Sequence, residues 1–170
     1  MVGGASIVRA AVLVGIAAVL EAALSPLFTY GWVGPRFAII GIVVATSGQR
    51  DLQALLLGFF GGILTDALAA GTGIFGVGAL GGIVAAAVAM RASGRKGNLR
   101  ATLALSTVVA VAAYALVGLF ALSLAGSGGP SIVAYLFGGI LPDALLNGVL
   151  AYLVGAWLLK VLAKDGGKQA

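Results

Sequence analysis

Three acidic residues, Glu21, Asp66 and Asp143, lie inside strongly apolar stretches of this 170-residue sequence. Asp66 and Asp143 belong to two nearly identical segments, FGGILTDAL and FGGILPDAL, which differ only at Thr65 and Pro142. Paired carboxylates can perform acid–base chemistry, but the sequence has no histidine, the commonest general base, and no cysteine. No metal cluster or phosphate-binding loop accompanies the acids. We therefore predict a protein that is not an enzyme and carries no cofactor or metal.

The composition indicates an integral membrane protein. Hydrophobic residues make up 61% of the chain and charged residues only 9%, with a mean hydropathy of +1.16. A soluble domain has about 25% charged residues. The net charge of +5 is interpreted as loop charge that sets membrane orientation, not as a nucleic-acid surface. The first apolar run has no cleavage site and more apolar runs follow it, so it is not a signal peptide. We expect one membrane domain over residues 1–170.

Six apolar segments are candidates for transmembrane helices, because a bilayer core needs about 17–25 apolar residues in a helix. Prolines place three boundaries: the first segment stops before Pro26, Pro35 opens the second, and Pro142 interrupts the last. The piece 131–141 is then interfacial or re-entrant, and the last span begins at Pro142. Asp51 is expected to cap the third segment. The expected segments are Ile7–Leu24, Trp32–Ser47, Leu52–Ala70, Gly73–Met90, Leu99–Ala125 and Ser131–Leu162.

The distribution of basic residues favours six spans with both termini in the cytoplasm. In that arrangement Arg9, Arg50, the loop 91–100 and the tail lie inside, and only Arg36 lies outside. The second segment is short, however, and a five-span arrangement with an outer N-terminus would misplace only Arg9. That alternative stays open.

The six-span arrangement predicts a polar cluster at the outer surface. Glu21, Asp66 and Asp143 would all lie in the outer halves of their helices, on the same side as Arg36. We expect Asp66 to meet Arg36 there, together with Glu21 or Asp143. An ionisable residue in a span is costly to insert and therefore indicates a functional contact or a buried polar one.

Small residues recur at four-residue spacing on three of the segments. Such stripes let helices approach closely, so they indicate helix packing within the chain or against a partner. The two acid-bearing copies would also run antiparallel, as in an inverted-repeat transporter, although the rest of the two halves shows no similarity. The stripes are Gly58, Gly62 and Asp66; Gly78, Gly82 and Ala86; and Gly139, Asp143 and Asn147.

The run GFFGGILTDALAAGTGIFGVGAL, residues 58–80, resembles the rod shape-determining protein MreD family. That family carries the pattern G-F-x-x-G-x-x-x-D, then a short small-residue loop, then G-x-x-A-L. The proline of GPRFAII and the Asn-Gly of LLNGVLAYL are similar to the starts of its second and last helices. The stretch 127–141 departs from the family because it is longer and more apolar. The matching positions are Gly58, Phe59, Gly62, Asp66, Gly76, Ala79, Leu80, Pro35 and Asn147.

The resemblance implies an all-α fold similar to the substrate-binding subunits of energy-coupling-factor vitamin transporters, and no catalysis. It implies a protein of the bacterial cytoplasmic membrane that binds the single-span protein MreC. Together they would act with MreB, RodA and a class B penicillin-binding protein in lateral peptidoglycan synthesis. The alternative is a vitamin-binding subunit of an importer, which predicts an outward polar pocket and partner contacts through Ala18 and Ala22. A basic cytoplasmic face would attract anionic membrane lipids.

Overall fold

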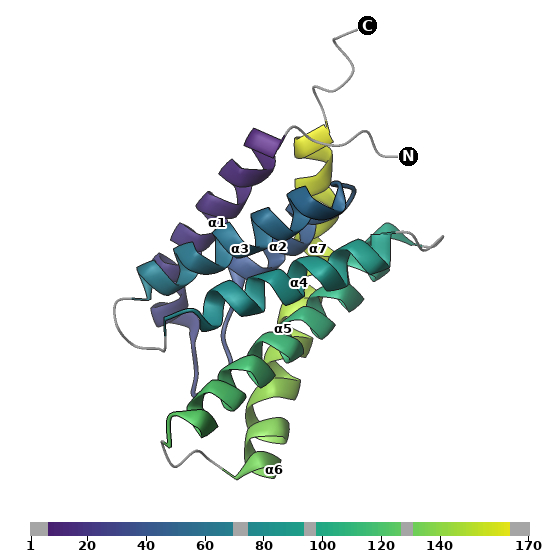
Figure 1. The fold of residues 1–170 in the computed structure, drawn as a ribbon. Coiled ribbons are helices and arrows are strands. Elements are labelled where there is room, and N and C mark those ends of the chain that lie inside the picture. Colours follow the sequence, from purple (N-terminus) through teal and green to yellow (C-terminus); the bar gives the residue numbers. More distant parts are fainter. Residues whose placement is uncertain (1–6, 70–74, 94–97, 127–130, 164–170) are drawn as a thin grey trace, which may run out of the picture.

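The computed structural model describes residues 7–69, 75–93, 98–126 and 131–163, which fold as helices and their connections (Figure 1). Within these ranges four helices are long and apolar enough to cross a membrane, by length and composition, and two shorter apolar helices accompany them. The prediction of a helical polytopic membrane protein is therefore confirmed. The elements are α1 (Ile7–Phe28), α2 (Phe37–Thr46), α3 (Asp51–Leu68), α4 (Val77–Ser93), α5 (Leu99–Leu124), α6 (Ile132–Tyr135), the π-helical turn η1 (Leu136–Ile140) and α7 (Leu141–Ala163).

The short helix α2 forms the centre of the bundle. It contacts α1, α3, α4, α5 and α7, and all of its residues after Phe37 are buried. A helix that is apolar on every side belongs in such a position. At 1.5 Å per residue its 10 residues span about 15 Å, half of a hydrocarbon core of about 30 Å.

The expected start of this helix at Trp32 is wrong, and Pro35 does not lie in its first turn. Residues 29–36 are irregular instead. Tyr30 and Val33 exchange two backbone hydrogen bonds, of 2.8 and 3.1 Å, around Gly31, whose φ of +63° is easily adopted by glycine. The chain then reaches α2 without helical hydrogen bonds of its own, so its backbone groups need other partners.

The first helix does not stop before Pro26, as the sequence predicted, but continues to Phe28. Its last turn is closed by the Thr29 amide, which donates to the Ser25 carbonyl at 2.8 Å, and by a 2.9 Å bond between the two hydroxyl groups. Proline is tolerated here because the hydroxyl bond and the following amide hold the turn together.

The predicted break at Pro142 is also wrong, because α6, η1 and α7 form one continuous helix. The amide of Leu141 donates to the carbonyl of Leu136, five residues back, which is the hydrogen bond of a π turn. This wider turn directly precedes Pro142 and makes room for a residue that has no amide hydrogen. Residues 131–141 are therefore the outer part of the last helix and not a re-entrant piece.

The glycine stripes of α3 and α4 face each other. A Cβ atom on Gly62 would collide with the carbonyl oxygen of Gly78, and one on Gly58 would collide with that of Gly82. The predicted close packing is thus internal to the chain, and this face of α3 is not available to a partner. The acid Asp51 is the first residue of α3, not its cap, and α4 begins later than expected, at Val77.

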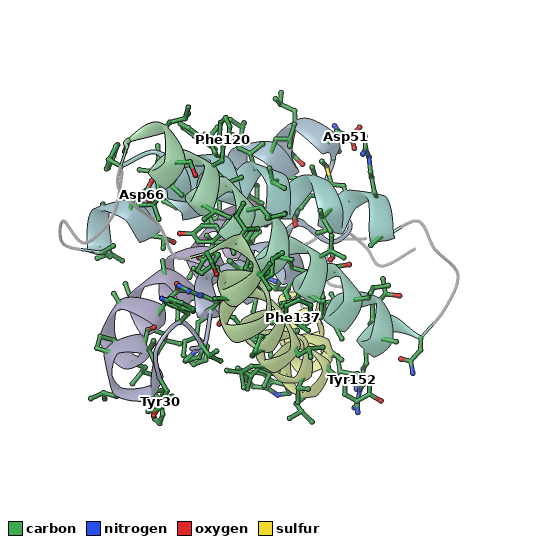
Figure 2. The ribbon with its side chains drawn as sticks, turned by 90° about the horizontal axis from the view of Figure 1, so that it is seen from below. Tyr30, Asp51, Asp66, Phe120, Phe137 and Tyr152 are labelled. Carbon is green, nitrogen blue, oxygen red and sulfur yellow. The ribbon has the colours of Figure 1, made fainter. Side chains whose placement is uncertain are left out.

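The two ends of the bundle differ. Helices α1, α3 and α5 finish at one end, which we call the outer end, and α2, α4 and α6 begin there. The start of α1 and the end of α7 lie together at the opposite end (Figure 1). At the outer end α5 and α6 extend beyond the other helices, and Figure 2 views the molecule from this side, with Tyr30 at its edge.

Candidate functional site: a polar pocket at the outer end

A cavity of about 690 Å³ opens at the outer end between α1, α3 and α5. Small-molecule sites commonly have volumes of about 300–1,000 Å³. The cavity is lined mainly by apolar side chains, and its chemistry comes from a few polar residues: Glu21 of α1, Arg36 before α2, Asp66 of α3 and Tyr114 of α5. It is the candidate functional site.

The polar floor of this pocket lies deep. Glu21 is 14 residues past the start of α1 (21 − 7), and Asp66 and Tyr114 are each 15 past the starts of α3 and α5 (66 − 51 and 114 − 99). At 1.5 Å per residue these positions are about 21–23 Å from the opposite ends of their helices, a distance shorter than a hydrocarbon core of about 30 Å. Irregular backbone at that depth must be buried in protein or line a hydrated cavity. In the connection before α2, Gly34 and Pro35 are buried, and Thr29 and Arg36 line the pocket.

Two side chains of α7 hold this connection. The carboxylate of Asp143 accepts hydrogen bonds from the Gly34 amide at 3.0 Å and from Arg36 Nε at 3.1 Å. The side chain of Asn147 accepts from the Arg36 amide at 2.6 Å and donates to the Gly34 carbonyl at 3.0 Å. Asp143 is 3% exposed and Asn147 is fully buried. The backbone groups that a helix would have satisfied are therefore satisfied from α7.

Glu21 caps α2 from a neighbouring helix. Its Oε2 accepts a hydrogen bond of 2.8 Å from the amide of Ala38, the second residue of α2. The residue at the N-cap position of α2, Arg36, makes no side-chain capping bond. A carboxylate at a helix N-terminus satisfies a free amide and interacts favourably with the helix dipole. This hydrogen bond gives a partner to one of the two carboxylate oxygens of Glu21, a residue that is otherwise buried in α1.

Asp66 caps α4 in the same way. Its two carboxylate oxygens accept bonds from the amides of Gly76 and Gly78, both at 2.8 Å, and Ala79 at 3.3 Å. Gly76 has a φ of +100°, a conformation that favours glycine, and this turn directs its amide to Asp66. The expected pairing of Asp66 with Arg36 is therefore wrong. The two line one pocket, but the ion-pair partner of Arg36 is Asp143, at 3.1 Å.

Three polar groups on the pocket wall have no hydrogen-bond partner among the described residues. They are Oε1 of Glu21, the two Nη atoms of Arg36 and the hydroxyl of Tyr114. The Arg36 side chain is 31% exposed. An arginine side chain is not deprotonated in proteins, and Asp143 supplies its counter-charge. The guanidinium therefore stays charged, with its outer edge open to the pocket.

A second cavity, of about 90 Å³, lies on the other side of Arg36 and Tyr114. It is bounded by Trp32 and Tyr135, whose rings meet edge to face with centroids 5.4 Å apart. These aromatic residues escaped the sequence analysis because single aromatics in apolar runs usually belong to the core. The sequence held one signal of the cavities themselves. Tyr114 and Gly118 are four residues apart and so lie on one face of α5, and each of them lines the two cavities.

The remaining motif positions are divided between structure and surface. Phe59 and Leu80 are 43% and 58% exposed and do not line the pocket. Ala18 and Ala22 both line the pocket, Ala18 as a buried residue and Ala22 as an exposed one. Several expected features lie outside the described residues: the end of the third segment and start of the fourth, the loop 94–97, residues 127–130, and the tail with Lys164 and Lys168.

Comparison of the chain with protein-family models, with curated proteins and with solved structures finds no match. The site is therefore interpreted from its own geometry.

We expect Asp66→Ala to lower stability by about 1–2 kcal/mol, the usual cost of losing a strong N-cap residue. Asp66→Asn retains one acceptor oxygen and should lose less. Thermal unfolding of the purified protein in detergent measures both. Asp51→Ala is the control, because Asp51 is exposed at the start of α3. Equal and negligible effects of Asp66→Ala and Asp51→Ala would contradict a capping role.

Proposed function

We propose that this protein is a non-enzymatic subunit of the bacterial cytoplasmic membrane that binds a partner through its outer pocket. The proposal gives it the role that its resemblance to the MreD family implies: it binds MreC and so helps to organise lateral peptidoglycan synthesis by MreB, RodA and a class B penicillin-binding protein. It includes six membrane crossings with both termini in the cytoplasm, and a fold related to the vitamin-binding subunits of energy-coupling-factor transporters.

The observation that carries the proposal is a 690 Å³ outer pocket whose Arg36 and Glu21 keep unpaired polar atoms. The acids Asp66 and Asp143 are occupied with structural bonds, and the glycine stripes of α3 and α4 are used inside the chain. The pocket is thus the concave surface left for recognition. A single-span partner would bring its juxtamembrane segment to this height beside the bundle.

Gly118 offers a way to close the pocket without disturbing the fold. A Cβ atom there would meet only Val77 Cγ1, at 3.9 Å, and Gly118 lines the cavity. We expect Gly118→Leu to fold normally and to reduce co-purification with MreC from the same organism at least tenfold, since a well-packed interface residue contributes about 1.4 kcal/mol or more. Gly15→Leu is the matched control, because Gly15 has no atom within 4 Å of its added Cβ. Equal recovery of MreC with both variants would refute the proposal.

The same pocket supports a second candidate, a vitamin-binding subunit of an importer, since that function requires an outward polar cavity. The two candidates differ in what the purified protein retains. Mass spectrometry of the denatured preparation should detect a small molecule in stoichiometric amount if the importer role is right, and none if the pocket holds a partner segment. Loss of that molecule in Gly118→Leu would assign it to the pocket.

A further inference from the structure

The free polar atoms of the pocket are of opposite kinds, donors on Arg36 and an acceptor on Glu21. Arg36 uses Nε for Asp143, which leaves its two Nη atoms as a forked donor edge toward the cavity. Glu21 uses Oε2 for the Ala38 amide, which leaves Oε1 as a free acceptor. Glu21 is 8% exposed, and among the described side chains no cation lies within 4.0 Å of it. A guanidinium and a carboxylate thus share one cavity without forming an ion pair with each other.

A ligand with a single charge would be poorly matched to this wall. An anion bound to Arg36 alone would leave Oε1 of Glu21 without a donor, and a cation bound to Glu21 alone would leave the Nη edge of Arg36 without an acceptor. A buried charge that remains unpaired is costly, whereas a charge-assisted hydrogen bond is about twice as strong as a neutral one. Only a group that carries both a negative and a positive charge binds Arg36 and Glu21 at the same time.

We propose that the outer pocket recognises a zwitterionic group, with a carboxylate or phosphate on the Nη edge of Arg36 and a protonated amine on Oε1 of Glu21. The inference rests on the proposed binding role and names the chemistry that the site selects. Such a group can belong to a free small molecule or to neighbouring acidic and basic side chains of a polypeptide. The hydroxyl of Tyr114, also unpaired, is a third contact for the anion.

Glu21→Gln tests the role of the carboxylate with little disturbance to the fold. Glutamine keeps an amide oxygen that can accept from Ala38, so the cap of α2 is retained. Its NH₂ group replaces the free acceptor Oε1 by a donor. The variant should therefore change the preference of the pocket from a zwitterion to a simple anion.

The probes are phosphoethanolamine and the dipeptide lysyl-glutamate, which carry both signs of charge, with inorganic phosphate and ethylamine as controls that carry one sign only. Their Kd values are measured on the full-length detergent-solubilised protein by ligand-observed NMR. We expect the zwitterions to bind the wild type about tenfold more tightly than either control, the size of one charge-assisted bond. Glu21→Gln should bind phosphate at least as tightly as phosphoethanolamine. Equal Kd values in the wild type, or an unchanged preference in Glu21→Gln, would overturn the inference.

Arg36→Lys keeps the inference testable if Glu21→Gln does not fold. Lysine retains the charge but not the forked donor edge. It should weaken every probe that carries a phosphate or a carboxylate and leave ethylamine unchanged; equal weakening of all probes, ethylamine included, would count against the assignment. Adding lysyl-glutamate or phosphoethanolamine as competitor during MreC co-purification distinguishes the two sources of the zwitterion. If a segment of MreC occupies the pocket, the competitor displaces MreC. If a co-purified small molecule occupies it, the competitor replaces that molecule instead.

The proposed function and this inference fail separately. MreC binding that is abolished by Gly118→Leu, with no zwitterion preference, would leave the function standing and remove the inference. A zwitterion preference that depends on Glu21, in a protein that does not bind MreC, would do the reverse.

Discussion

Gly62→Leu should abolish the folded state. The backbone carbonyl of Gly78 occupies the position of the added Cβ, and a helix backbone cannot move aside as a flexible side chain can. Overpacking a close-packed interior typically costs about 1–3 kcal/mol, and a clash with the backbone of the neighbouring helix belongs at or above the top of that range. We expect the variant to aggregate on size-exclusion chromatography in detergent.

Gly15→Leu, on the same kind of apolar helix, should elute as a single species like the wild type, because its added side chain meets open space. Gly62→Ala is the graded case and should melt well below the wild type. If Gly62→Leu and Gly15→Leu elute and melt alike, the glycine contact between α3 and α4 is not required for the fold.

Asp143→Asn should cost about 3 kcal/mol of unfolding free energy, the lower part of the range for breaking a buried ion pair from one side, since Arg36 keeps some exposure. The change leaves the guanidinium without its counter-ion and weakens the bond to the Gly34 amide. Thermal or chemical unfolding in detergent measures the loss, with Asp51→Asn as an exposed control.

A double-mutant cycle with Arg36→Gln isolates the pair. The double variant should be less damaged than the sum of the single ones, because it leaves no unpaired charge behind. Additive losses would mean that Asp143 acts only through the connection before α2.

The sequence predicted the helical segments well where composition alone decides them. The segment starting at Leu99 matches α5 almost residue for residue, because nothing in that run competes with helix. The expected start of α2 was wrong for the opposite reason. Residues 32–36 are apolar enough for a helix, but Asp143 and Asn147 bind their backbone groups instead. Those partners lie more than 100 residues away along the chain, beyond the reach of local patterns.

The candidate site was predicted in part. Glu21, Arg36 and Asp66 line one pocket, as their places in the outer parts of the expected segments predicted. Depth could not decide which acid meets Arg36, because three acids lie at similar heights and the choice depends on how the helices are arranged around α2. Glu21 and Asp66 accept hydrogen bonds from the free amides at the starts of α2 and α4. Asp143 is therefore the acid that pairs with Arg36.

The proline predictions failed for a local reason. A proline disrupts a helix through its missing amide and its clash with the preceding turn. At Pro26 the helix has only two residues left, and at Pro142 a π turn widens the preceding turn. Neither adjustment is encoded by proline itself, so a rule based on the residue alone overestimates the break.

The short central helix has a consequence for how the protein is made. A segment of 10 residues cannot cross the bilayer by itself, so membrane insertion of α2 depends on the neighbours that flank it during synthesis. The connection before it gains its hydrogen-bond partners only when α7, which is translated more than 100 residues later, has entered the membrane. The second helix therefore stays incompletely held until α7 is in place, and α7 then fixes the connection that carries Arg36 into the outer pocket. Truncation before residue 143 removes the pocket's support as well as one span.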